Sequence, residues 1–303
     1  KKSSLLYFLL PISGIWWLAT KILLTFSISK KMPLPIICVG NITVGGNGKT
    51  PTALAISALL KELGYNPHIV SRGYKGQFRG PHLVETEVNT FLEVGDEPLM
   101  MSLYSPTWIG RSRRDTIKSA FENGADIIIM DDGFQNNSVK KDLSVLVVDV
   151  SVVFGNGLII PAGPLREPIK DGFKRADLLV TVGTQNDQIN FKEAFSNLDK
   201  PIQIEASLQP RVKNINWSGK TVVAFAGISH PSKFFNLLEE LGANIISRIS
   251  FPNHEPFKKK ALENLIEQSN KENALLVTTE KDSVRIPKNL RKFFHVLNVD
   301  LKF

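Results

Sequence analysis

The sequence predicts an α/β protein with a mainly parallel sheet, a second and smaller α/β unit, and a membrane-associated helix at its N-terminus. Three observations lead to this prediction. Short apolar runs alternate with amphipathic segments after residue 31, the same alternation begins again near residue 210, and residues 5–28 carry a single charged side chain. Alternation of this kind is typical of parallel strands joined by right-handed crossovers. The length of 303 residues suits about two domains.

The first element is the apolar segment 5–28, which is long enough to cross a membrane because spanning takes about 20 residues. Pro11, Gly14 and Lys21 interrupt it, whereas two adjacent tryptophans favour a membrane interface. Lysines flank both ends, so the charge pattern does not set an orientation. A secretory signal peptide is the competing interpretation, but segment 24–32 offers a poor small-residue cleavage site. We expect a helix that spans the membrane or lies in its interface; a soluble helix packed on the body is the alternative.

The composition indicates a folded protein with a basic N-terminus. Hydrophobic residues make up 43% of the chain and charged residues 22%, which fits a globular rather than a disordered protein. The net charge is +8, and residues 1–31 hold five lysines and no acid. This placement favours a membrane surface over nucleic acid, for which the sequence shows no signature. Cys38 is the only cysteine, which excludes an internal disulfide and a cysteine-cluster metal site.

The remaining elements follow from the spacing of apolar residues. In the first unit, strands are predicted at 34–40, 66–73, 125–133, 144–150 and 176–183, and a helix at 50–63. In the second unit, strands are predicted at 221–228, 243–251 and 273–282, and helices at 231–241 and 257–270. We expect an N-terminal helix (1–31), a nucleotide-binding domain (32–209) and a smaller α/β domain (210–303). The Gly- and Pro-rich segment 155–175 is a candidate functional loop.

Residues 40–50, Gly-Asn-Ile-Thr-Val-Gly-Gly-Asn-Gly-Lys-Thr, lie between a predicted strand and a predicted helix, which is the context of a phosphate-binding loop. Glycines let the backbone curl so that its N–H groups face phosphates, and the helix dipole adds to the attraction. Lys49 would reach the β and γ phosphates, and the Thr50 hydroxyl would bind magnesium. The strict pattern GxxxxGK[ST] is not met, because its first glycine falls on Thr43. A tight turn with an incidental lysine is the alternative.

Two carboxylates, Asp131 and Asp132, end the apolar run 127–130. An aspartate at the end of a strand beside a phosphate loop usually holds magnesium, directly or through water. The alternative is that both residues only terminate the strand. Together, the loop and these acids predict a P-loop NTPase core that binds ATP and Mg²⁺.

Three classes of P-loop protein compete for this pattern. GTPases carry an Asn-Lys-x-Asp motif after a strand, and neither 270–273 nor 280–282 has that motif in that place. The partitioning and septum-site ATPases share the Gly-Gly-x-Gly-Lys-Thr loop, but they carry a signature lysine where this chain has Val44. A membrane-recruited regulatory ATPase of this type is the alternative to a kinase.

The motif pattern resembles the tetraacyldisaccharide 4'-kinase family, which phosphorylates the lipid A precursor in Gram-negative bacteria. The matching segments occur in family order and span nearly the whole chain: 39–41 with 45–51, Ser-Arg-Gly-Tyr (71–74), Gly-Asp-Glu-Pro (95–98), Asp-Asp-Gly-Phe-Gln-Asn (131–136), Pro-Ala-Gly-Pro-Leu-Arg-Glu-Pro (161–168), Phe-Pro-Asn-His (251–254) and Thr-Thr-Glu-Lys-Asp (278–282). One departure is Asn253, where the family pattern has aspartate.

The resemblance implies roles for individual residues. Asp96 would be the catalytic base, with His254 orienting it and Lys49 neutralising phosphate charge, in a cleft between the two units. The nucleotide would be bound by Asn41, Gly45, Gly46, Asn47, Gly48, Lys49, Thr50 and Pro51. The magnesium ligands would be Thr50, Asp131, Asp132 and Gln135. The lipid acceptor would be bound by Arg72, Arg111, Arg166 and Glu167.

The resemblance also implies partners and a location. The expected activity is transfer of the ATP γ-phosphate to the 4'-hydroxyl of the tetraacyldisaccharide 1-phosphate lipid A precursor. The expected partners are this acylated disaccharide and inner-membrane lipid, with no nucleic acid and no obligate protein partner. The expected location is the cytoplasmic face of the inner membrane of a Gram-negative bacterium.

Overall fold

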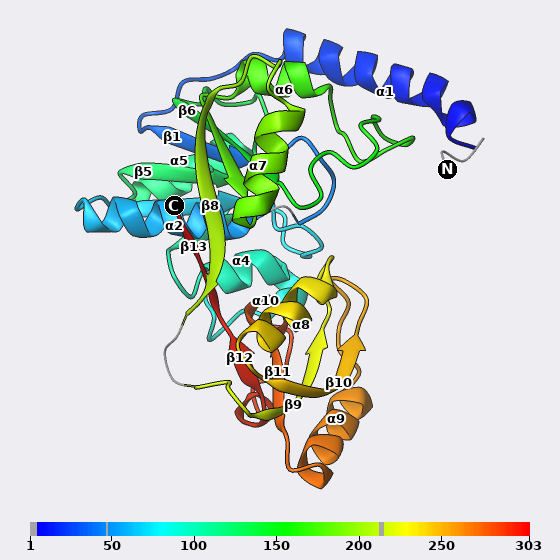
Figure 1. The fold of residues 1–303 in the computed structure, drawn as a ribbon. Coiled ribbons are helices and arrows are strands. Elements are labelled where there is room, and N and C mark those ends of the chain that lie inside the picture. The colour runs from blue at the N-terminus through cyan, green and yellow to red at the C-terminus, as the bar shows by residue number, and fades with distance from the viewer. Residues whose placement is uncertain (1–4, 47, 212–214) are drawn as a thin grey trace.

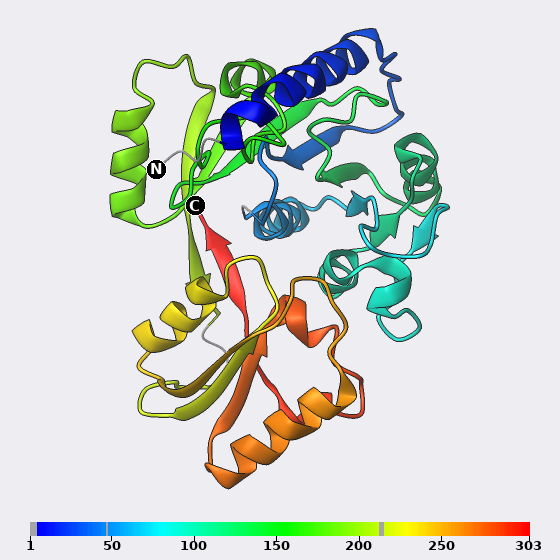
Figure 2. The same ribbon diagram turned by 90° about the vertical axis from the view of Figure 1, so that its right-hand side faces the viewer.

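The computed structural model describes residues 5–46, 48–211 and 215–303. The chain forms two α/β units, one around a nine-stranded sheet and one around a four-stranded sheet. Figures 1 and 2 show the four-stranded unit below the nine-stranded unit, with helix α1 along the opposite, upper side. The predicted fold class, a mainly parallel α/β core with a smaller α/β unit and an N-terminal apolar helix, is confirmed.

The nine-stranded sheet has the order β13-β8-β7-β6-β1-β5-β2-β4-β3. Its strands are parallel except at the two edges, where β3 and β13 run antiparallel to their neighbours. The strands are β1 (Ile36–Gly40), β2 (Pro67–Ser71), β3 (His82–Leu83), β4 (Thr107–Ile109), β5 (Ile127–Asp131), β6 (Leu143–Asp149), β7 (Leu178–Val182), β8 (Ile202–Pro210) and β13 (Val299–Lys302). The carboxyl ends of β1 and β5, where the predicted phosphate loop and acidic pair follow, are therefore neighbours.

Helices cover both faces of this sheet. The helices of this unit are α1 (Leu5–Phe26), α2 (Lys49–Glu62), α3 (Phe91–Val94), α4 (Asp96–Met101), α5 (Arg113–Glu122), α6 (Ile169–Arg175) and α7 (Gln185–Ala194), of which α1 is largely exposed. Successive side chains of a strand point to opposite faces. In β1, Cys38 packs with Ile117 of α5, whereas Val39 packs with Ala53 of α2. The inner strands β1, β2 and β5 are buried on both faces, which explains their apolar runs.

The C-terminal strand β13 does not lie with the rest of the C-terminal third of the chain. It pairs antiparallel with β8 at the edge of the nine-stranded sheet, with Leu301 opposite Leu208. Leu301 is buried in the same core cluster as Val39 and Ala53. The chain therefore crosses between the units twice, after β8 and before β13, and a domain boundary near residue 210 stays a prediction.

The four-stranded sheet is parallel throughout, in the order β10-β9-β11-β12. Its elements are β9 (Thr221–Ala226), α8 (Pro231–Glu240), β10 (Asn244–Ser250), α9 (Lys259–Lys271), β11 (Leu275–Thr279), α10 (Glu280–Ser283), η1 (Arg291–Phe293) and β12 (His295–Leu297). The strand predicted at 273–282 ends at Thr279, because the Thr279 side chain accepts a hydrogen bond from the Asp282 N–H and starts α10.

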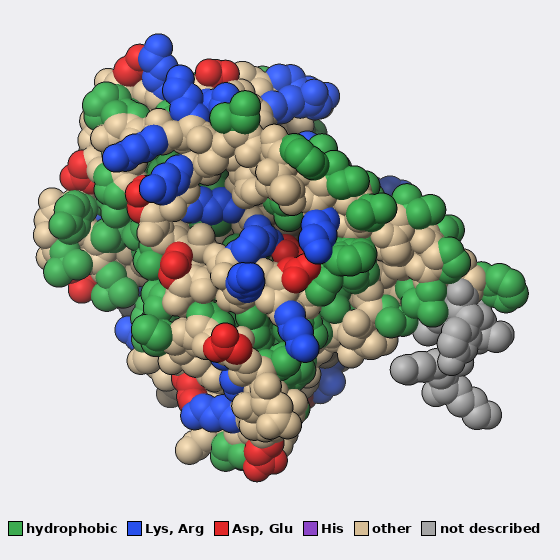
Figure 3. Space-filling model, turned by 90° about the horizontal axis from the view of Figure 1, so that it is seen from above, with side chains coloured by type: hydrophobic (Ala, Val, Ile, Leu, Met, Phe, Trp, Pro, Cys, Tyr) green, Lys and Arg blue, Asp and Glu red, His purple; other side chains and the backbone are tan. Residues whose placement is uncertain are grey.

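Helix α1 lies against the body at two places and is otherwise exposed. The Ser13 hydroxyl donates to the Ile159 carbonyl (2.8 Å), and near the C-terminal end of the helix the Asn137 amide donates to the Leu24 carbonyl (3.0 Å). Among the described residues, α1 is the one helix long and apolar enough to cross a membrane, and only 6% of its apolar window is buried. Figure 3 shows its hydrophobic side chains exposed along the arm at the right, beside a surface with many Lys and Arg side chains.

Candidate active site

The predicted phosphate loop connects β1 to α2, which begins at Lys49, one residue earlier than predicted. Gly48 precedes the helix with a left-handed backbone (φ 82°), which glycine adopts without steric cost. Pro51 lies in the first turn, where a missing N–H leaves no helix bond unmade. The Lys49 ammonium lies 3.2 Å from the Gly45 carbonyl oxygen. Asn47, a predicted nucleotide contact, lies outside the described residues.

The acidic pair ends the neighbouring strand β5. Asp131 is its last residue and is 1% exposed; its Oδ2 accepts from the Ser71 hydroxyl at 3.3 Å. Burial, followed by the charges of Glu97 and Asp132, raises the pKa of Asp131 to about 7. Asp132 has a left-handed backbone (φ 47°) and lies 3.8 Å from the Lys49 ammonium. The structure thus places one buried and one exposed carboxylate beside the phosphate loop.

This donor set fits magnesium. The Asp131 Oδ1 is buried and has no hydrogen-bond partner among the described residues. Those residues include no cluster of three or more His, Cys, Asp or Glu side chains that could enclose a metal ion. Magnesium needs no such cluster, because it usually binds one or two carboxylates together with substrate phosphates and water.

Four further predicted residues meet in one hydrogen-bonded group beside this pair. The Arg166 guanidinium donates to Asp132 Oδ1 (3.1 Å) and to Gln135 Oε1 (3.0 Å). The Gln135 amide donates to the Asn41 carbonyl (2.8 Å) and to Glu167 Oε1 (3.0 Å). The Gly- and Pro-rich loop is held against the phosphate loop, because the Arg166 N–H donates to the Ile42 carbonyl at 2.7 Å. Predicted metal, nucleotide and acceptor residues therefore form one continuous surface.

The other two predicted acceptor residues lie further along the same edge of the sheet. Arg72 follows β2 directly, and Arg111 comes two residues after the end of β4. Both side chains are exposed, and their strands are parallel neighbours. The nearby Arg113, in contrast, is buried and donates to the Asp131 carbonyl at 3.2 Å, which gives it a structural role.

Asp96 and His254, which are 158 residues apart in the sequence, are in direct contact. Asp96 begins α4 and is 4% exposed, and the His254 Nδ1 lies 2.9 Å and 2.8 Å from its two carboxylate oxygens. Burial alone would raise the pKa of Asp96, but the His254 hydrogen bond and the Lys281 charge outweigh it and hold this pKa below its usual range. His254 has a left-handed backbone (φ 63°), which is uncommon for residues other than glycine and clusters at functional sites.

A lysine that the sequence analysis did not assign also contacts this pair. Lys281, in α10, lies 2.8 Å from Glu97 Oε1, 3.9 Å from Asp96 Oδ2 and 3.4 Å from His254 Nε2. Its side chain is 18% exposed. The Thr-Thr-Glu-Lys-Asp motif (278–282) could have pointed to Lys281 as a site residue. The sequence does not show, however, which residues this motif contacts in the fold.

A buried ion pair positions the loop that carries His254. Arg285 and Asp282, both in or just after α10, are bonded to each other and fully buried. Arg285 also donates to the carbonyl of Glu255 (2.8 Å), and Asp282 accepts from the Gly227 N–H (3.0 Å). A buried ion pair that also bonds to backbone groups of the surrounding loops holds those loops in place. Asn253, the residue at which the sequence departs from the family pattern, donates to the Ser229 hydroxyl (2.9 Å) in one of these loops.

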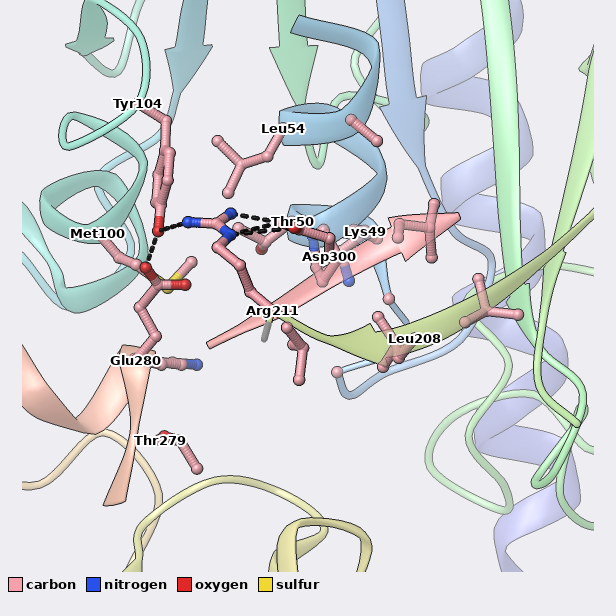
Figure 4. Close-up of a pocket in the computed structure, with 18 of the residues that line it drawn as sticks. Lys49, Thr50, Leu54, Met100, Tyr104, Leu208, Arg211, Thr279, Glu280 and Asp300 are labelled. Carbon is pink, nitrogen blue, oxygen red and sulfur yellow. Dashed lines mark hydrogen bonds and ion pairs between the residues drawn. The ribbon is translucent and has the colours of Figure 1, made fainter. Parts of the chain in front are cut away.

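A cavity of about 970 Å³ lies between the phosphate loop and the four-stranded unit. The phosphate loop and α2 contribute Lys49, Thr50 and Leu54, and Figure 4 shows these side chains on one side of the cavity. Thr279 and Glu280 line it from the four-stranded unit. The volume is in the range of cofactor pockets and suits a nucleotide.

Four polar side chains that the sequence analysis also did not assign form a network at the wall of this cavity (Figure 4). The Arg211 Nε lies 3.0 Å from both carboxylate oxygens of Asp300, and its Nη1 donates to the Tyr104 hydroxyl at 3.0 Å. Tyr104 donates in turn to Glu280. Burial, together with Glu280, raises the pKa of Tyr104 to about 12. The network connects both chain crossings to α4 and α10.

Comparison with known proteins agrees with this geometry. A family model described as LpxK, tetraacyldisaccharide-1-P 4'-kinase, matches residues 5–303. The tetraacyldisaccharide 4'-kinase of Paramagnetospirillum magneticum is 43% identical over 293 residues, covering 97% of this chain and 89% of that protein. One from Methylorubrum extorquens is 44% identical over 271 residues, covering 89% of this chain and 82% of that protein.

A solved structure gives the same result. The crystal structure of LpxK from Aquifex aeolicus, an "apo" form in complex with ATP, superposes with a TM-score of 0.76 at 26% identity and covers 98% of this chain and 95% of that one. The match over nearly the whole length, in sequence and in structure, leads to one conclusion: this chain belongs to the tetraacyldisaccharide 4'-kinase family.

Proposed function

We propose that this protein transfers the γ-phosphate of ATP to the 4'-hydroxyl of the tetraacyldisaccharide 1-phosphate lipid A precursor, with Asp96 as the catalytic base. Family membership supports the ATP-dependent kinase activity. The observation that supports the base is the contact between Asp96 and His254 at 2.8 Å, in a buried position beside the cavity of the phosphate loop.

The proposed reaction is a direct transfer. The acceptor hydroxyl gives its proton to the Asp96 carboxylate while its oxygen attacks the γ-phosphorus, and the bond from that phosphorus to the β–γ bridging oxygen breaks. The products are the phosphorylated lipid and ADP. Phosphoryl transfer of this kind depends mainly on positioning and charge neutralisation, plus a base for the hydroxyl proton. His254 keeps Asp96 oriented and supports its ionised form.

The charge of the transferred group would be neutralised by side chains that already lie together. Lys49 and Arg166 both lie near Asp132, at 3.8 Å and 3.1 Å. Lys49 also begins α2, and the N-terminus of a helix favours negative charge. Thr50, Asp131, Asp132 and Gln135 would hold Mg²⁺, which would supply positive charge to offset that of the phosphates. Asn41, Gly45, Gly46, Asn47, Gly48 and Pro51 would complete the nucleotide site.

The acceptor would lie across the carboxyl edge of the sheet. Arg72, Arg111 and Arg166 supply positive charge there, and arginine binds phosphate through two parallel hydrogen bonds. Glu167 is 3% exposed and is paired with Arg175, so it would act by holding Gln135 and Arg175 in place rather than by binding the sugar in its present position.

The exposed helix α1 would bring the enzyme to its acylated substrate on the cytoplasmic face of the inner membrane. Contacts at Ser13, in the middle of the helix, and at Leu24, near its C-terminal end, fix α1 to the body. A helix attached in this way cannot be surrounded by lipid along its whole length. We therefore propose that α1 lies in the membrane interface, with its exposed apolar face among the acyl chains.

The test uses γ-labelled ATP and the detergent-dispersed lipid disaccharide, with the wild type, Asp96→Ala and a control, Asp199→Ala, at an exposed loop position. The expected result is label on the lipid with the wild type and the control, and a loss of about 100-fold or more with Asp96→Ala. If no label reached the lipid while ATP hydrolysis survived in Asp96→Ala, the activity would instead be that of a partitioning-type regulatory ATPase.

A further inference from the structure

The contacts of Lys281 are unusual because one ammonium meets three ionisable side chains from two separate segments of the chain. Asp96 and Glu97 begin α4 in the nine-stranded unit, whereas His254 follows β10 in the four-stranded unit. Lys281 itself lies in α10, which packs on α4 through a small apolar cluster that includes Val284. The position of Lys281 is therefore fixed by packing between the two units. Lys281 does not lie on a flexible surface segment.

The hydrogen-bond chemistry of this cluster is restrictive. A lysine ammonium only donates, so the His254 Nε2 that faces Lys281 at 3.4 Å must present its lone pair. The proton of a neutral imidazole then sits on Nδ1, which lies 2.8 Å from an Asp96 oxygen. In this arrangement the His254 Nδ1–H donates to Asp96, and the Asp96 carboxylate accepts this hydrogen bond in its ionised form. The Lys281 position thus favours one tautomer of His254 and the ionised form of Asp96.

Four titratable or charged groups surround Asp96. His254 and Lys281 contact it, and the Arg285 guanidinium, just after α10, adds a positive charge. Glu97, on the same helix as Asp96, adds a negative charge beside it. Lys281 neutralises Glu97 directly, at 2.8 Å. Without Lys281, the neighbouring carboxylates of Asp96 and Glu97 would lose the cation that both of them face.

We propose that Lys281 is a positioning residue for phosphoryl transfer, holding Asp96 ionised and His254 neutral with its proton on Nδ1. This inference rests on the proposed role of Asp96 as the base. It makes Lys281 necessary for keeping Asp96 free of a proton and ready to accept one, and not only for joining the units. A lysine that served only to join the units would affect stability but would not change how the reaction depends on pH.

The chain offers a matched control for this distinction. Lys288 also pairs with a glutamate across the two units, Glu87, at 2.9 Å, but that pair is exposed and shares no partner with the Asp96–His254 contact. Lys288→Met therefore removes an ion pair between the units and leaves the cluster intact. Lys281→Arg keeps the positive charge, whereas Lys281→Met and Lys281→Gln remove it, and the glutamine can still donate to Glu97.

The experiment measures kcat/KM for the lipid acceptor as a function of pH with full-length protein in detergent. The acidic limb of this profile reports protonation of the Asp96–His254 pair. Loss of a positive charge at this distance is expected to move the limb to higher pH by about 1 unit in Lys281→Met and Lys281→Gln. Lys281→Arg is expected to keep the limb near the wild-type position, and Lys288→Met to leave it unchanged.

The outcomes separate the two proposals. A limb that stays at the wild-type position in the neutral variants, or that moves equally in Lys288→Met, would overturn the role of Lys281. If only Lys281→Met failed to fold, Lys281→Gln would decide in its place. If Asp96→Ala kept its activity, the base assignment would fail first; if Asp96→Ala were inactive and the limb did not move, only the role of Lys281 would fail.

Discussion

Several residues around the proposed site have a backbone conformation that side chains normally avoid. Asp132 (φ 47°) and His254 (φ 63°) are both left-handed, and Gly95, directly before Asp96, has φ 92° and ψ 151°. The two non-glycine residues, Asp132 and His254, cost about 1–3 kcal/mol each, and the surrounding structure must enforce their conformation, whereas Gly95 adopts its backbone angles without this cost. At His254, the Arg285 contacts to its loop enforce the conformation. The backbone strain at Asp132 and His254 therefore lies in residues of the proposed active site.

Substitution of Gly95 tests whether the backbone conformation before Asp96 is needed to position this carboxylate. A Cβ atom there would lie 2.7 Å from the Tyr74 carbonyl oxygen, on a backbone that alanine rarely adopts. Gly95→Ala is therefore expected to displace Asp96 and to lower kcat by about tenfold or more, with a loss of about 1–3 kcal/mol in the free energy of unfolding. Steady-state kinetics and urea unfolding measure the two effects. Gly80→Ala is the control, because a Cβ there meets nothing within 4 Å; equal effects of both substitutions would contradict the argument.

The residues around the phosphate loop were predictable from the sequence, and those across the cavity were not. Lys49, Asp132 and Arg166 come from motifs whose chemistry shows in their composition, and parallel strands bring such motifs to one edge of a sheet. Lys281, Tyr104 and Arg211 gain their roles only from the packing of one unit on the other. No local pattern marks Tyr104 or Arg211, and the motif that contains Lys281 does not show which residues it contacts.

At the scale of elements, the sequence predicted the longer buried strands and missed the short buried strand β4 and the edge strands. Strands β1, β5 and β6 are continuous apolar runs because both of their faces are covered. Strand β8 is mostly exposed, with Ala206 as its buried residue, and β13 has only four residues. Such segments become strands by pairing with each other, as Leu208 does with Leu301, and no short window of sequence can show a contact over that separation.

Helix α1 allows a test of membrane binding separate from catalysis. The side chains of Ile15 and Leu23 are 70% and 72% exposed, so replacing both by aspartate leaves the packing of the body unchanged. Burial of such side chains among lipids is worth about 1.5–3 kcal/mol each. We expect Ile15→Asp with Leu23→Asp to weaken binding to anionic phospholipid vesicles at least about tenfold, as measured by flotation. Leu63→Asp, at an equally exposed position (73%) after α2, is expected to bind like the wild type; weaker binding by this control would contradict the role of α1.

At the scale of the whole molecule, contacts between the two units surround the cavity. On one side lie the Asp96–His254 pair and the Tyr104–Glu280 bond; on the other, Lys233 of α8 pairs with Asp149 at the end of β6. Figure 2 shows the two units joined by the crossing strands on the side of β8 and β13. The cavity is thus bounded by two chain crossings and by ion pairs, an arrangement that suits a substrate-dependent change in the spacing of the units.

The Lys233–Asp149 pair tests whether the units have this arrangement in solution. The Asp149 side chain is 9% exposed and that of Lys233 is 44% exposed, so the two partners are unequal. Lys233→Met leaves a nearly buried carboxylate with only its local Ser151 hydrogen bonds, at a cost of about 1–3 kcal/mol. Asp149→Asn leaves an ammonium that can turn to water, which costs less. The double variant should therefore be no less stable than Lys233→Met alone.

A double-mutant cycle by urea unfolding measures this coupling, which is expected to reach at least about 0.5 kcal/mol because the two residues are in contact. The matched comparison is Lys192 with Glu205, an exposed pair within the nine-stranded unit whose side chains are 56% and 43% exposed. Exposed pairs are worth between about 0 and 1 kcal/mol, so this second cycle should give a smaller coupling. Additive effects of Lys233→Met and Asp149→Asn would mean that the two units do not make this contact in solution. The cavity would then be open on that side, and the nucleotide would have to bring the units together before transfer.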